Sequence, residues 1–351
     1  MTDPSVQTDS PADALTIKLP AGFDVLAADE ALSAGITEAL DQVEEQLLEA
    51  LTTDDELTNT SARYLAEAGG KRIRPLLTVL TAQLFDGVNA EVRQAAAVME
   101  MIHLATLYHD DVMDSAPLRR GTPSAHEVWG NSVAILTGDL ILSRASRMMA
   151  ELSQEGARVQ SHTFERLVMG QLHETVGPQG SEDAYKHYLS VIADKTGSLV
   201  AAAARLGAHF GGAEGAQTQL LHDYGEAVGI AFQLADDIID LAADGEASGK
   251  TPGTDLREGV PTLPVLLLRG AAAQGDEAAR DALTLVDGDL SSDEALAEAV
   301  SAVVAHPVTE RAWEVARSWS ARAKEAIADL PDSTVKQALN SFADAVVDRE
   351  G

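Results

Sequence analysis

The sequence has no cysteine and few basic side chains. Without cysteine there can be no disulfide bond and no thiolate metal site, and the redox compartment is not indicated. The 25 lysine and arginine residues stand against 56 aspartate and glutamate residues, which gives a formal net charge of −31. Such a charge argues against binding to nucleic acid or to an anionic membrane over most of the surface. Any phosphate-binding site must therefore be local.

Long apolar stretches and targeting signals are also missing. No uninterrupted apolar run of about eighteen residues occurs, so we expect no transmembrane helix. Residues 1–20 contain acids, prolines and Lys18 as the one basic residue, and they lack the apolar core of a signal peptide. We therefore expect a cytoplasmic protein.

Helical periodicity runs through most of the chain, and none of the periodic segments shows the alternation of a strand. The expected helices are 28–51, 58–68, 75–85, 91–109, 131–152, 157–175, 182–209, 216–241, 261–274, 277–286, 292–305, 308–327 and 333–348. We predict an all-α fold, a large single-domain helical bundle around a central cavity that spans residues 26–351. The polar residues 1–25 before it are predicted to be poorly ordered.

Two groups of three aspartates end two of the expected helices. The groups are Asp110-Asp111-Val112-Met113-Asp114 and Asp236-Asp237-Ile238-Ile239-Asp240. In each group the first and last aspartates are four residues apart and share a helix face. One such group is common on a solvated surface, but two that face each other would line a cavity with six carboxylates. Such a cavity needs several divalent ions, and Mg²⁺ held by carboxylates and a diphosphate fits it.

Two basic groups interrupt the acidic sequence. They are Lys71, Arg72 and Arg74, which follow Gly69 and Gly70, and Arg119 and Arg120, which follow Pro117. The first seventy residues otherwise contain fifteen acidic and two basic side chains. A glycine turn lets the backbone approach an anion closely, and basic residues at a helix start oppose the helix dipole. An anionic ligand is therefore favoured over a solvated helix start.

The block Gly69-Gly70-Lys71-Arg72-Ile73-Arg74-Pro75 and the two aspartate groups resemble those of the trans-polyprenyl diphosphate synthases, which elongate prenyl chains head to tail. Matching blocks run from about Gly69 to Pro264 in the order of that family. The resemblance implies an isoprenoid-synthase bundle, a homodimer and about three Mg²⁺ per active site. It implies isopentenyl diphosphate and an allylic diphosphate as substrates.

The resemblance also implies roles for individual residues. The metal ligands would be Asp110, Asp114 and Asp236, and both complete aspartate groups would be catalytic together with Lys195. Isopentenyl diphosphate would be bound by Lys71, Arg74, His103 and Arg120. The allylic diphosphate would be bound by Arg119, Lys195, Thr196, Gln233 and Lys250, and a helical kink at Lys195 and Thr196 would face the cavity. Taken alone, a histidine on a helix such as His103 is more often a core residue, and Lys250 could be an ordinary loop lysine.

Signatures of other chemistries are absent from the sequence. It has no GxSxG motif, no cysteine nucleophile and no Rossmann glycine fingerprint, so acyl transfer and hydride transfer have no candidate residues. Metal ions and basic residues could instead draw charge onto a leaving diphosphate. The allylic substrate would then ionise to a carbocation, the double bond of isopentenyl diphosphate would attack it, and loss of a proton would restore a trans alkene.

The helix before Asp110 predicts the length of the product. Most of Met99, Ile102, Ala105 and Thr106 lie beneath the face of Asp110. In the family, a bulky aromatic residue five positions before the first aspartate closes the tunnel for the hydrocarbon tail, whereas a small one leaves it open. Ala105 occupies that position, although it could simply be a packing residue. With Met99 roughly 16 Å below Asp110 as a deeper floor, we predict about six to ten isoprene units.

Four other interpretations remain. A short-chain synthase that makes geranylgeranyl or farnesyl diphosphate is the main alternative. A terpene cyclase would share the fold and the first aspartate group but would not need the isopentenyl-binding residues. A non-catalytic subunit of a two-component synthase should have lost metal aspartates, and none is missing. An acidic helical scaffold would leave the paired aspartate groups and the basic groups unexplained.

Overall fold

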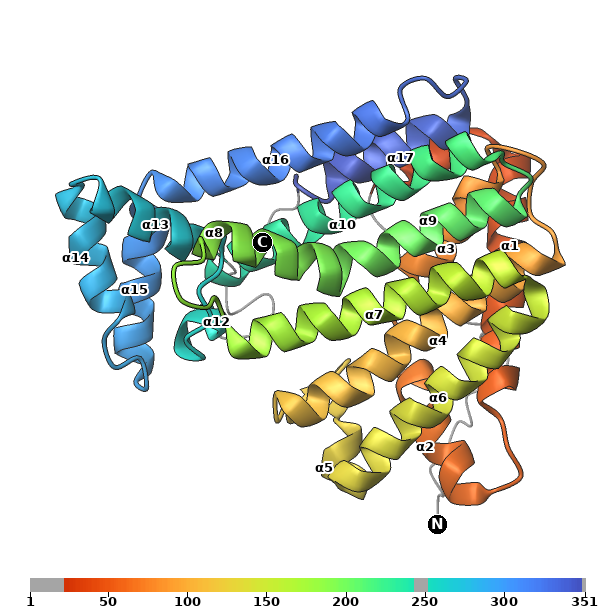
Figure 1. Cartoon of the computed structure of the whole chain (residues 1–351), viewed down its shortest axis with the longest axis horizontal. Helices are drawn as coiled ribbons and strands as arrows, with labels where there is room; N and C mark the ends of the chain where they lie inside the picture. The colour runs from red at the N-terminus through yellow and green to blue at the C-terminus, as the bar shows by residue number, and fades with distance from the viewer. Residues whose placement is uncertain (1–21, 243–251, 349–351) are drawn as a thin grey trace, which may run out of the picture.

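Helices make up most of residues 22–242 and 252–348, which the computed structural model describes (Figure 1). In chain order the elements are the 3-10 helix η1 (Asp24–Ala28), α1 (Glu30–Leu51), α2 (Glu56–Glu67), α3 (Ile73–Ala82), α4 (Ala90–Met113), β1 (Leu118–Arg119), β2 (Thr122–Pro123), α5 (Ala125–Trp129), α6 (Asn131–Leu152), α7 (Gln154–Val176), α8 (Ala184–Ile192), the π-helical turn η2 (Ala193–Gly197), α9 (Ser198–Phe210), α10 (Gly215–Ala242), α12 (Thr254–Arg257), α13 (Leu263–Ala273), α14 (Glu277–Val286), α15 (Asp293–Ala305), α16 (Val308–Ala326) and α17 (Thr334–Ala345). Within this part of the chain the strands form one short antiparallel pair. The predicted all-α fold class is confirmed.

Side-chain caps set where several helices begin. The carboxylate of Asp55 accepts the backbone N–H of Thr58 at 2.8 Å and starts α2 two residues before the expected position. Asn89 accepts the backbone N–H of Val92 at 2.9 Å and starts α4. Such caps satisfy backbone donors that have no partner inside the helix. The differences of a few residues between the expected and observed helix ends follow largely from these local bonds.

The long helices form layers around three apolar clusters. One cluster lies among α3, α9, α10, α16 and α17, and a second lies among α1, α2, α4, α6 and α9. The third joins α13, α14 and α15 to the end of α10 at one side of the molecule (Figure 1). The C-terminal ends of α4, α7 and α10 all point toward that same side. None of the described helices is both long and apolar enough to cross a membrane.

The expected helix 182–209 is divided into α8, η2 and α9. In η2 the backbone N–H of Ser198 bonds to the carbonyl of Ala193, five residues earlier, rather than four. Such π-turns are rare and usually mark a single inserted residue in an α-helix. The kink expected at Lys195 and Thr196 is therefore a π-turn that contains both residues.

The described N-terminal residues belong to the fold, although the sequence predicted a poorly ordered segment up to residue 25. The ring of Phe23 has no exposed surface and stacks on Phe342 of α17, with 4.7 Å between ring centroids. Gly22 has a positive φ of 94°, and a Cβ there would lie 2.7 Å from Cβ of Ala345. Residues 22–25 are thus fixed by packing on α17. Residues 1–21 lie outside the described residues, and their predicted disorder stays a prediction.

We predict that Phe23→Ala lowers the free energy of unfolding by about 3 kcal/mol, because it removes a fully buried ring and leaves a cavity. Denaturation in urea, followed by circular dichroism, measures the change. Leu57→Ala on α2 is the control, because that side chain is 51% exposed and should change the value by less than about 0.5 kcal/mol. Equal effects of the two substitutions would show that the N-terminal packing does not contribute to stability.

Candidate active site

The two aspartate groups lie in the last turns of α4 and α10. Helix α4 ends at Met113 with Asp114 as its C-cap, and α10 ends at Ala242. A helix C-terminus carries partial negative charge, so carboxylates there are unfavourable unless a cation is near. Burial raises the pKa of Asp110 to about 6; Lys195 acts against this shift and Asp114 adds to it. The first aspartate group is thus a place where negative charge accumulates.

The middle aspartate of the first group does not face the cavity. Asp111 has no exposed surface, and it accepts a hydrogen bond of 2.6 Å from Nε of Arg119. Consecutive residues on a helix point about 100° apart, so Asp111 leaves the face that Asp110 and Asp114 share. Asp111 is thus turned away from the face of Asp110 and Asp114, and of the six aspartates Asp237 is the one in the wall of the cavity described below. Arg119, which was assigned to the allylic diphosphate, is paired with Asp111 in this structure, and its side chain is 31% exposed.

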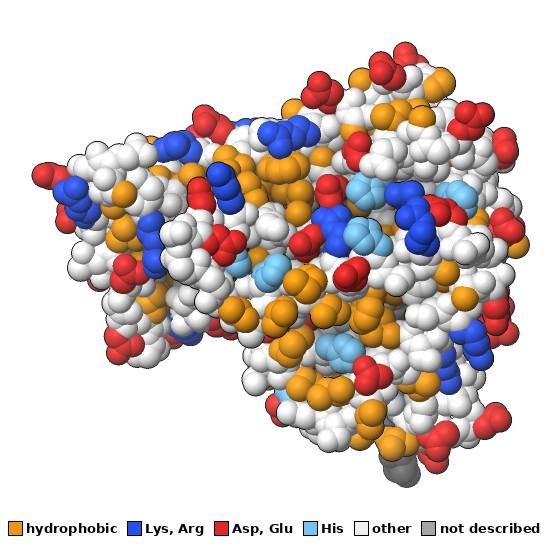
Figure 2. All heavy atoms as spheres, in the orientation of Figure 1, with side chains coloured by type: hydrophobic (Ala, Val, Ile, Leu, Met, Phe, Trp, Pro, Cys, Tyr) orange, Lys and Arg blue, Asp and Glu red, His pale blue; other side chains and the backbone are white. Residues whose placement is uncertain are grey.

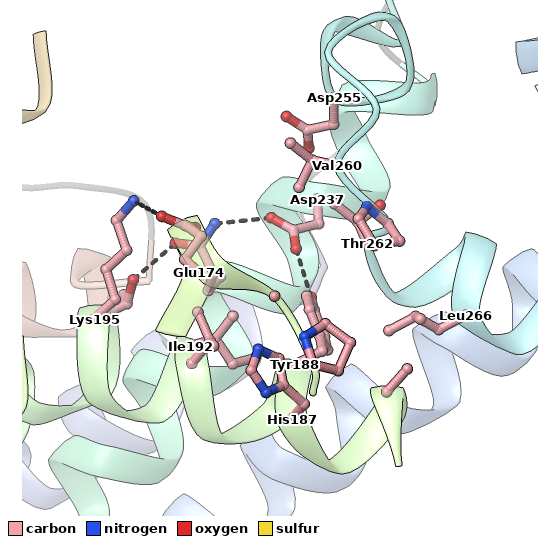
Figure 3. A pocket seen from close by; sticks show the side chains of 17 residues that line it. Glu174, His187, Tyr188, Ile192, Lys195, Asp237, Asp255, Val260, Thr262 and Leu266 are labelled. Carbon is pink, nitrogen blue, oxygen red and sulfur yellow. Dashed lines mark hydrogen bonds and ion pairs between the residues drawn. The ribbon is translucent and has the colours of Figure 1, made fainter. Parts of the chain in front are cut away.

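The second aspartate group is tied into a chain of hydrogen bonds (Figure 3). Tyr188 donates its hydroxyl to Oδ2 of Asp237 at 2.5 Å, and Nε2 of Gln233 donates to Oδ1 at 2.8 Å. The hydroxyl of Thr196 donates to Oε1 of Gln233 at 2.9 Å. Burial raises the pKa of Asp237 to about 6. Two residues assigned to the allylic substrate, Thr196 and Gln233, are thus linked to this aspartate.

These side chains line a cavity of about 300 Å³ between the ends of α7, α8 and α10 and the start of α13 (Figure 3). Four predicted site residues form part of its wall: Lys195, Thr196, Gln233 and Asp237. The ammonium group of Lys195 pairs with the carboxylate of Glu174, which ends α7. Val191, Ile192 and Leu266 give the rest of the wall an apolar character. The cavity therefore combines a cation, carboxylates and apolar surface.

Sequence reasoning missed five polar residues of this cavity: Glu174, His187, Tyr188, Asp255 and Thr262. Burial, together with the charges of Asp240 and Asp237, raises the pKa of Asp255 to about 7. The charge of Glu174 raises the pKa of both Asp110 and Asp255, so carboxylates of both helix ends act on one region. Tyr188 lies seven residues, or two helical turns, before Lys195. This spacing puts the two residues on one helix face, and it was the one signal in the sequence that could have placed Tyr188 near the site.

The oxygen donors fit a metal ion that is bound together with a diphosphate. Among the described residues, no three histidine, aspartate or glutamate side chains are close enough to hold an ion by themselves. Mg²⁺ is usually held by one or two carboxylates and completes its shell with water and phosphate oxygens. Asp110 and Asp114 share a face and offer such a pair. The arrangement is suited to joint binding of metal and diphosphate.

On the other side of α4, Arg72 is fully occupied by internal bonds. Its Nε and Nη2 donate to Glu44 of α1 at 2.7 Å each, and its Nη1 donates to Glu100 of α4 at 3.0 Å. The carbonyls of Ala66 and Gly69 accept further bonds at 2.8 and 3.2 Å. A guanidinium has five N–H donors, so these five bonds leave none for a ligand. Arg72 is a structural residue.

Arg74, by contrast, keeps donor capacity. Its Nε is buried and has no hydrogen-bond partner within the described part of the chain, and burial lowers its pKa. Burial also holds the pKa of His103 well below its usual range, with the charges of Arg74 and Arg120 adding to the shift, so His103 is neutral at pH 7. Lys71 is exposed beside them. This cluster fits an anion, which would supply the missing acceptor.

The guanidinium groups of Arg72 and Arg120 pack against the Gly69–Gly70 turn. Nη1 of Arg120 donates to the carbonyls of Leu65, at 2.6 Å, and Gly69. A Cβ on Gly70 would lie 2.9 Å from Cζ of Arg120 and equally close to Nη1 of Arg72, and its φ is +147°. Glycine is therefore required there both for conformation and for space.

The residues assigned to product length are buried below Asp110. Met99, Ile102 and Ala105 have no exposed surface and lie in the same apolar cluster as Ala134 and Ile141 of α6. Thr106 is partly exposed and donates its hydroxyl to the carbonyl of His103 at 2.9 Å. A tail that followed this face would run between α4 and α6. Lys250, assigned to the allylic diphosphate, lies outside the described residues.

Comparison with known proteins decides the family. The polyprenyl synthetase family model matches residues 55–303. The chain is 45% identical over 332 residues to the nonaprenyl diphosphate synthase of Mycobacterium tuberculosis, covering 94% of this chain and 98% of that protein. The chain belongs to the polyprenyl synthetase family. It is therefore a prenyltransferase, and the family recognised from the aspartate groups is confirmed.

Solved structures of the family share the fold. A geranylgeranyl pyrophosphate synthase from Corynebacterium glutamicum, complexed with calcium and isoprenyl diphosphate, is 39% identical and has a TM-score of 0.81 over 91% of this chain and 97% of its own. A polyprenyl synthase from Caulobacter crescentus with the same ligands is 32% identical, with a TM-score of 0.81 over 95% and 99% of the two chains. The isoprenoid-synthase type of bundle predicted from the sequence is thereby confirmed.

We predict that Arg72→Met destabilises the fold by about 3 to 5 kcal/mol, because it removes the partner of the half-buried Glu44 and leaves the buried carboxylate of Glu100 only its longer contact with Arg120, at 3.7 Å. Urea denaturation measures this change, and Arg317→Met, which removes an exposed pair with Glu310 on α16, should change it by less than about 1 kcal/mol. Adding Glu100→Gln to Arg72→Met should recover part of the loss. A loss no larger than that of Arg317→Met would contradict the structural role of Arg72.

Proposed function

We propose that the protein is a magnesium-dependent synthase that condenses isopentenyl diphosphate with an allylic diphosphate to an all-trans product of about six to ten isoprene units. The observation that carries this proposal is a pair of different polar clusters, each of which acts electrostatically on a residue of α4: Lys195 on Asp110, and Arg74 on Glu100. One is the carboxylate-rich cavity with Lys195, and the other is the arginine cluster around Arg74. The 45% identity to a nonaprenyl diphosphate synthase supports the long product.

The allylic diphosphate would bind at the acid side. Asp110, Asp114 and Asp236 would hold about three Mg²⁺ between them and the diphosphate, and the ions would neutralise charge on the leaving group. Lys195 would exchange its pairing with Glu174 for a diphosphate oxygen, and Thr196 and Gln233 would orient the same group. Arg119 and Lys250 would complete this site. Apolar wall residues such as Val191 and Ile192 would keep water from the reacting carbon.

Isopentenyl diphosphate would bind at the basic side. Arg74 would give its unused Nε–H to a phosphate oxygen, and neutral His103 would donate one ring N–H. Lys71 would contribute charge from the rim, and Arg120 would do so from its position on the glycine turn. Both substrates would then meet near Asp110, with their tails directed along the face of α4 that carries Ala105.

A homodimer is supported by an exposed apolar surface on α6 and α7. Large apolar side chains on these helices are 40–65% exposed: Ile135, Leu136, Val168, Met169, Leu172 and Val176. Figure 2 shows hydrophobic side chains gathered over this face. Contiguous apolar patches commonly mark protein–protein contacts. The cytoplasmic location stays a prediction from the sequence.

Incubation of the purified protein with farnesyl diphosphate, isopentenyl diphosphate and MgCl₂ tests the function. We expect consumption of isopentenyl diphosphate, loss of activity with EDTA, and products of about six to ten isoprene units on reversed-phase chromatography. Products that stop at twenty carbons would support the short-chain alternative instead. A hydrocarbon product made without isopentenyl diphosphate would indicate a cyclase, and no product at all would favour a non-catalytic subunit.

We predict that Asp110→Asn, Asp114→Asn or Asp236→Asn each lowers kcat by about a hundredfold or more, because each removes a charged metal ligand. Steady-state rates at saturating MgCl₂ measure the loss, and circular dichroism checks that the fold is kept. Asp289→Asn, in the loop before α15, is the matched control and should retain wild-type activity. Rates within a few-fold of wild type would contradict the metal assignment.

We predict that Ala105→Phe shortens the product to farnesyl or geranylgeranyl length, because the ring would block the space beneath Asp110. Chromatography of the dephosphorylated products gives the chain lengths. Ala95→Phe, two turns or more deeper in the same buried helix, controls for general overpacking of α4 and should leave a product longer than that of Ala105→Phe. An unchanged product spectrum in Ala105→Phe would show that the tunnel lies elsewhere.

A further inference from the structure

The π-turn η2 presents Lys195 and Thr196 to the cavity, and it is held between α7 and α10. A π-turn has poorer hydrogen-bond geometry than the α-helix on either side of it, and such turns recur at functional sites. Its backbone carbonyls receive extra donors here. The hydroxyl of Ser198 donates to the carbonyl of Asp194 at 2.6 Å, and Nη2 of Arg166 donates to the carbonyl of Ala193 at 3.3 Å.

Helix α7 contacts the π-turn with one face. Arg166, Gly170 and Glu174 are four residues apart and therefore lie above one another. Nε of Arg166 binds Oδ1 of Asp194 at 2.7 Å, and Glu174 pairs with the ammonium group of Lys195. A Cβ on Gly170 would lie 2.7 Å from the backbone nitrogen of Lys195. The two helices touch at this glycine, with an ion pair on each side of the contact.

Helix α10 contacts the π-turn from the other side, again through residues that are four positions apart. Gly225, Gly229 and Gln233 share a face, and a Cβ on Gly229 would lie 2.9 Å from Cα of Gly197. Gln233 accepts the hydrogen bond of Thr196. Glu226, next to Gly225, reaches across to Nη1 of Arg166 at 2.6 Å. Arg166 thus connects α7, the π-turn and α10.

We propose that Arg166 is a positioning residue for prenyl transfer, which holds the π-turn through Asp194 and Glu226 so that Lys195 and Thr196 face the allylic diphosphate. The ion pairs differ from those of the outer surface, since the side chains of Arg166 and Asp194 are each only 22% exposed. Arg166 is not one of the residues that line the cavity, and it acts on Lys195 and Thr196 through the π-turn. The proposal rests on the proposed function, which gives Lys195 and Thr196 their roles.

The first test is Arg166→Gln, which keeps the length and polarity of the side chain but removes its charge and its fork of donors. We expect kcat/KM for the allylic substrate to fall between about tenfold and a hundredfold, because small displacements of catalytic groups cost this much. KM for isopentenyl diphosphate should stay within about threefold, since the arginine cluster is untouched. Arg158→Gln on the same helix, which removes a surface pair with Glu155, is the control and should match wild type.

A double-mutant cycle separates positioning from a general structural effect. If Arg166 acts through the π-turn, the loss in Arg166→Gln/Lys195→Gln should be within about threefold of the loss in Lys195→Gln alone. Fully multiplicative losses would overturn the proposal, as would an Arg166→Gln variant no worse than Arg158→Gln. Equal losses for both substrates with a lowered Tm would also overturn it, because they would indicate general destabilisation.

Two further variants keep the test decisive. Arg166→Lys and Glu226→Gln each retain part of the contact and should lower kcat/KM for the allylic substrate by less than Arg166→Gln does. These two variants provide the test if Arg166→Gln does not fold at the assay temperature. Lys195→Gln measured alone distinguishes this proposal from the function on which it rests. Wild-type rates in Lys195→Gln would remove the assigned role of Lys195, whereas an impaired Lys195→Gln beside an unimpaired Arg166→Gln would remove only the role of Arg166.

Discussion

The structure depends on an accumulation of negative charge at the C-terminal ends of two helices. Asp110 and Asp114 end α4, and Asp236 and Asp240 end α10, where the helix dipoles already contribute partial negative charge. The charge of Glu174, in the last turn of α7, adds to that of Asp110 and of Asp255 in α12. The pKa values of Asp110, Asp237 and Asp255 are raised mainly by burial, and neighbouring carboxylates add to each shift. Cations together with a polyanion would relieve this accumulation of charge, so the site is organised for a ligand rather than for the stability of the free protein.

The basic residues are of two kinds: some have all their N–H donors bonded within the protein, and others keep an unused donor. Arg72 gives all five donors to acceptors within the protein, whereas Nε of Arg74 is buried and unpartnered in the described chain. The carboxylates of Glu44 and Glu100 neutralise the charge of Arg72. A buried cluster of like charges is tolerable only when it is neutralised in this way. The buried Nε–H of Arg74 is left as a donor that an anion could use, in a chain whose net charge is −31.

Sequence reasoning reached the fold class, most helices and four residues that line the cavity, Lys195, Thr196, Gln233 and Asp237, because these follow from short-range patterns and motifs. Helical periodicity located the long helices within a few residues, and the i, i+4 spacing put Asp110 and Asp114 on one face. The same geometry, applied to Asp111, would have predicted its burial. Glu44 and Glu100, which hold Arg72, are far from it in sequence, and nothing local indicated that they converge. Glu174 was missed for the same reason.

Close contacts between helix backbones were the hardest feature to predict from the sequence, because each depends on a glycine at one particular turn of a helix. Gly170 on α7 and Gly229 on α10 look in the sequence like weak points in helices. In the fold each lies against the π-turn, so that a methyl group at either position would collide with backbone. A π-turn in the open could relax to an α-helix and rotate Lys195 away from the cavity. Glycine contacts on two sides leave no room for that relaxation, and the ion pairs of Arg166 tie both sides to the turn.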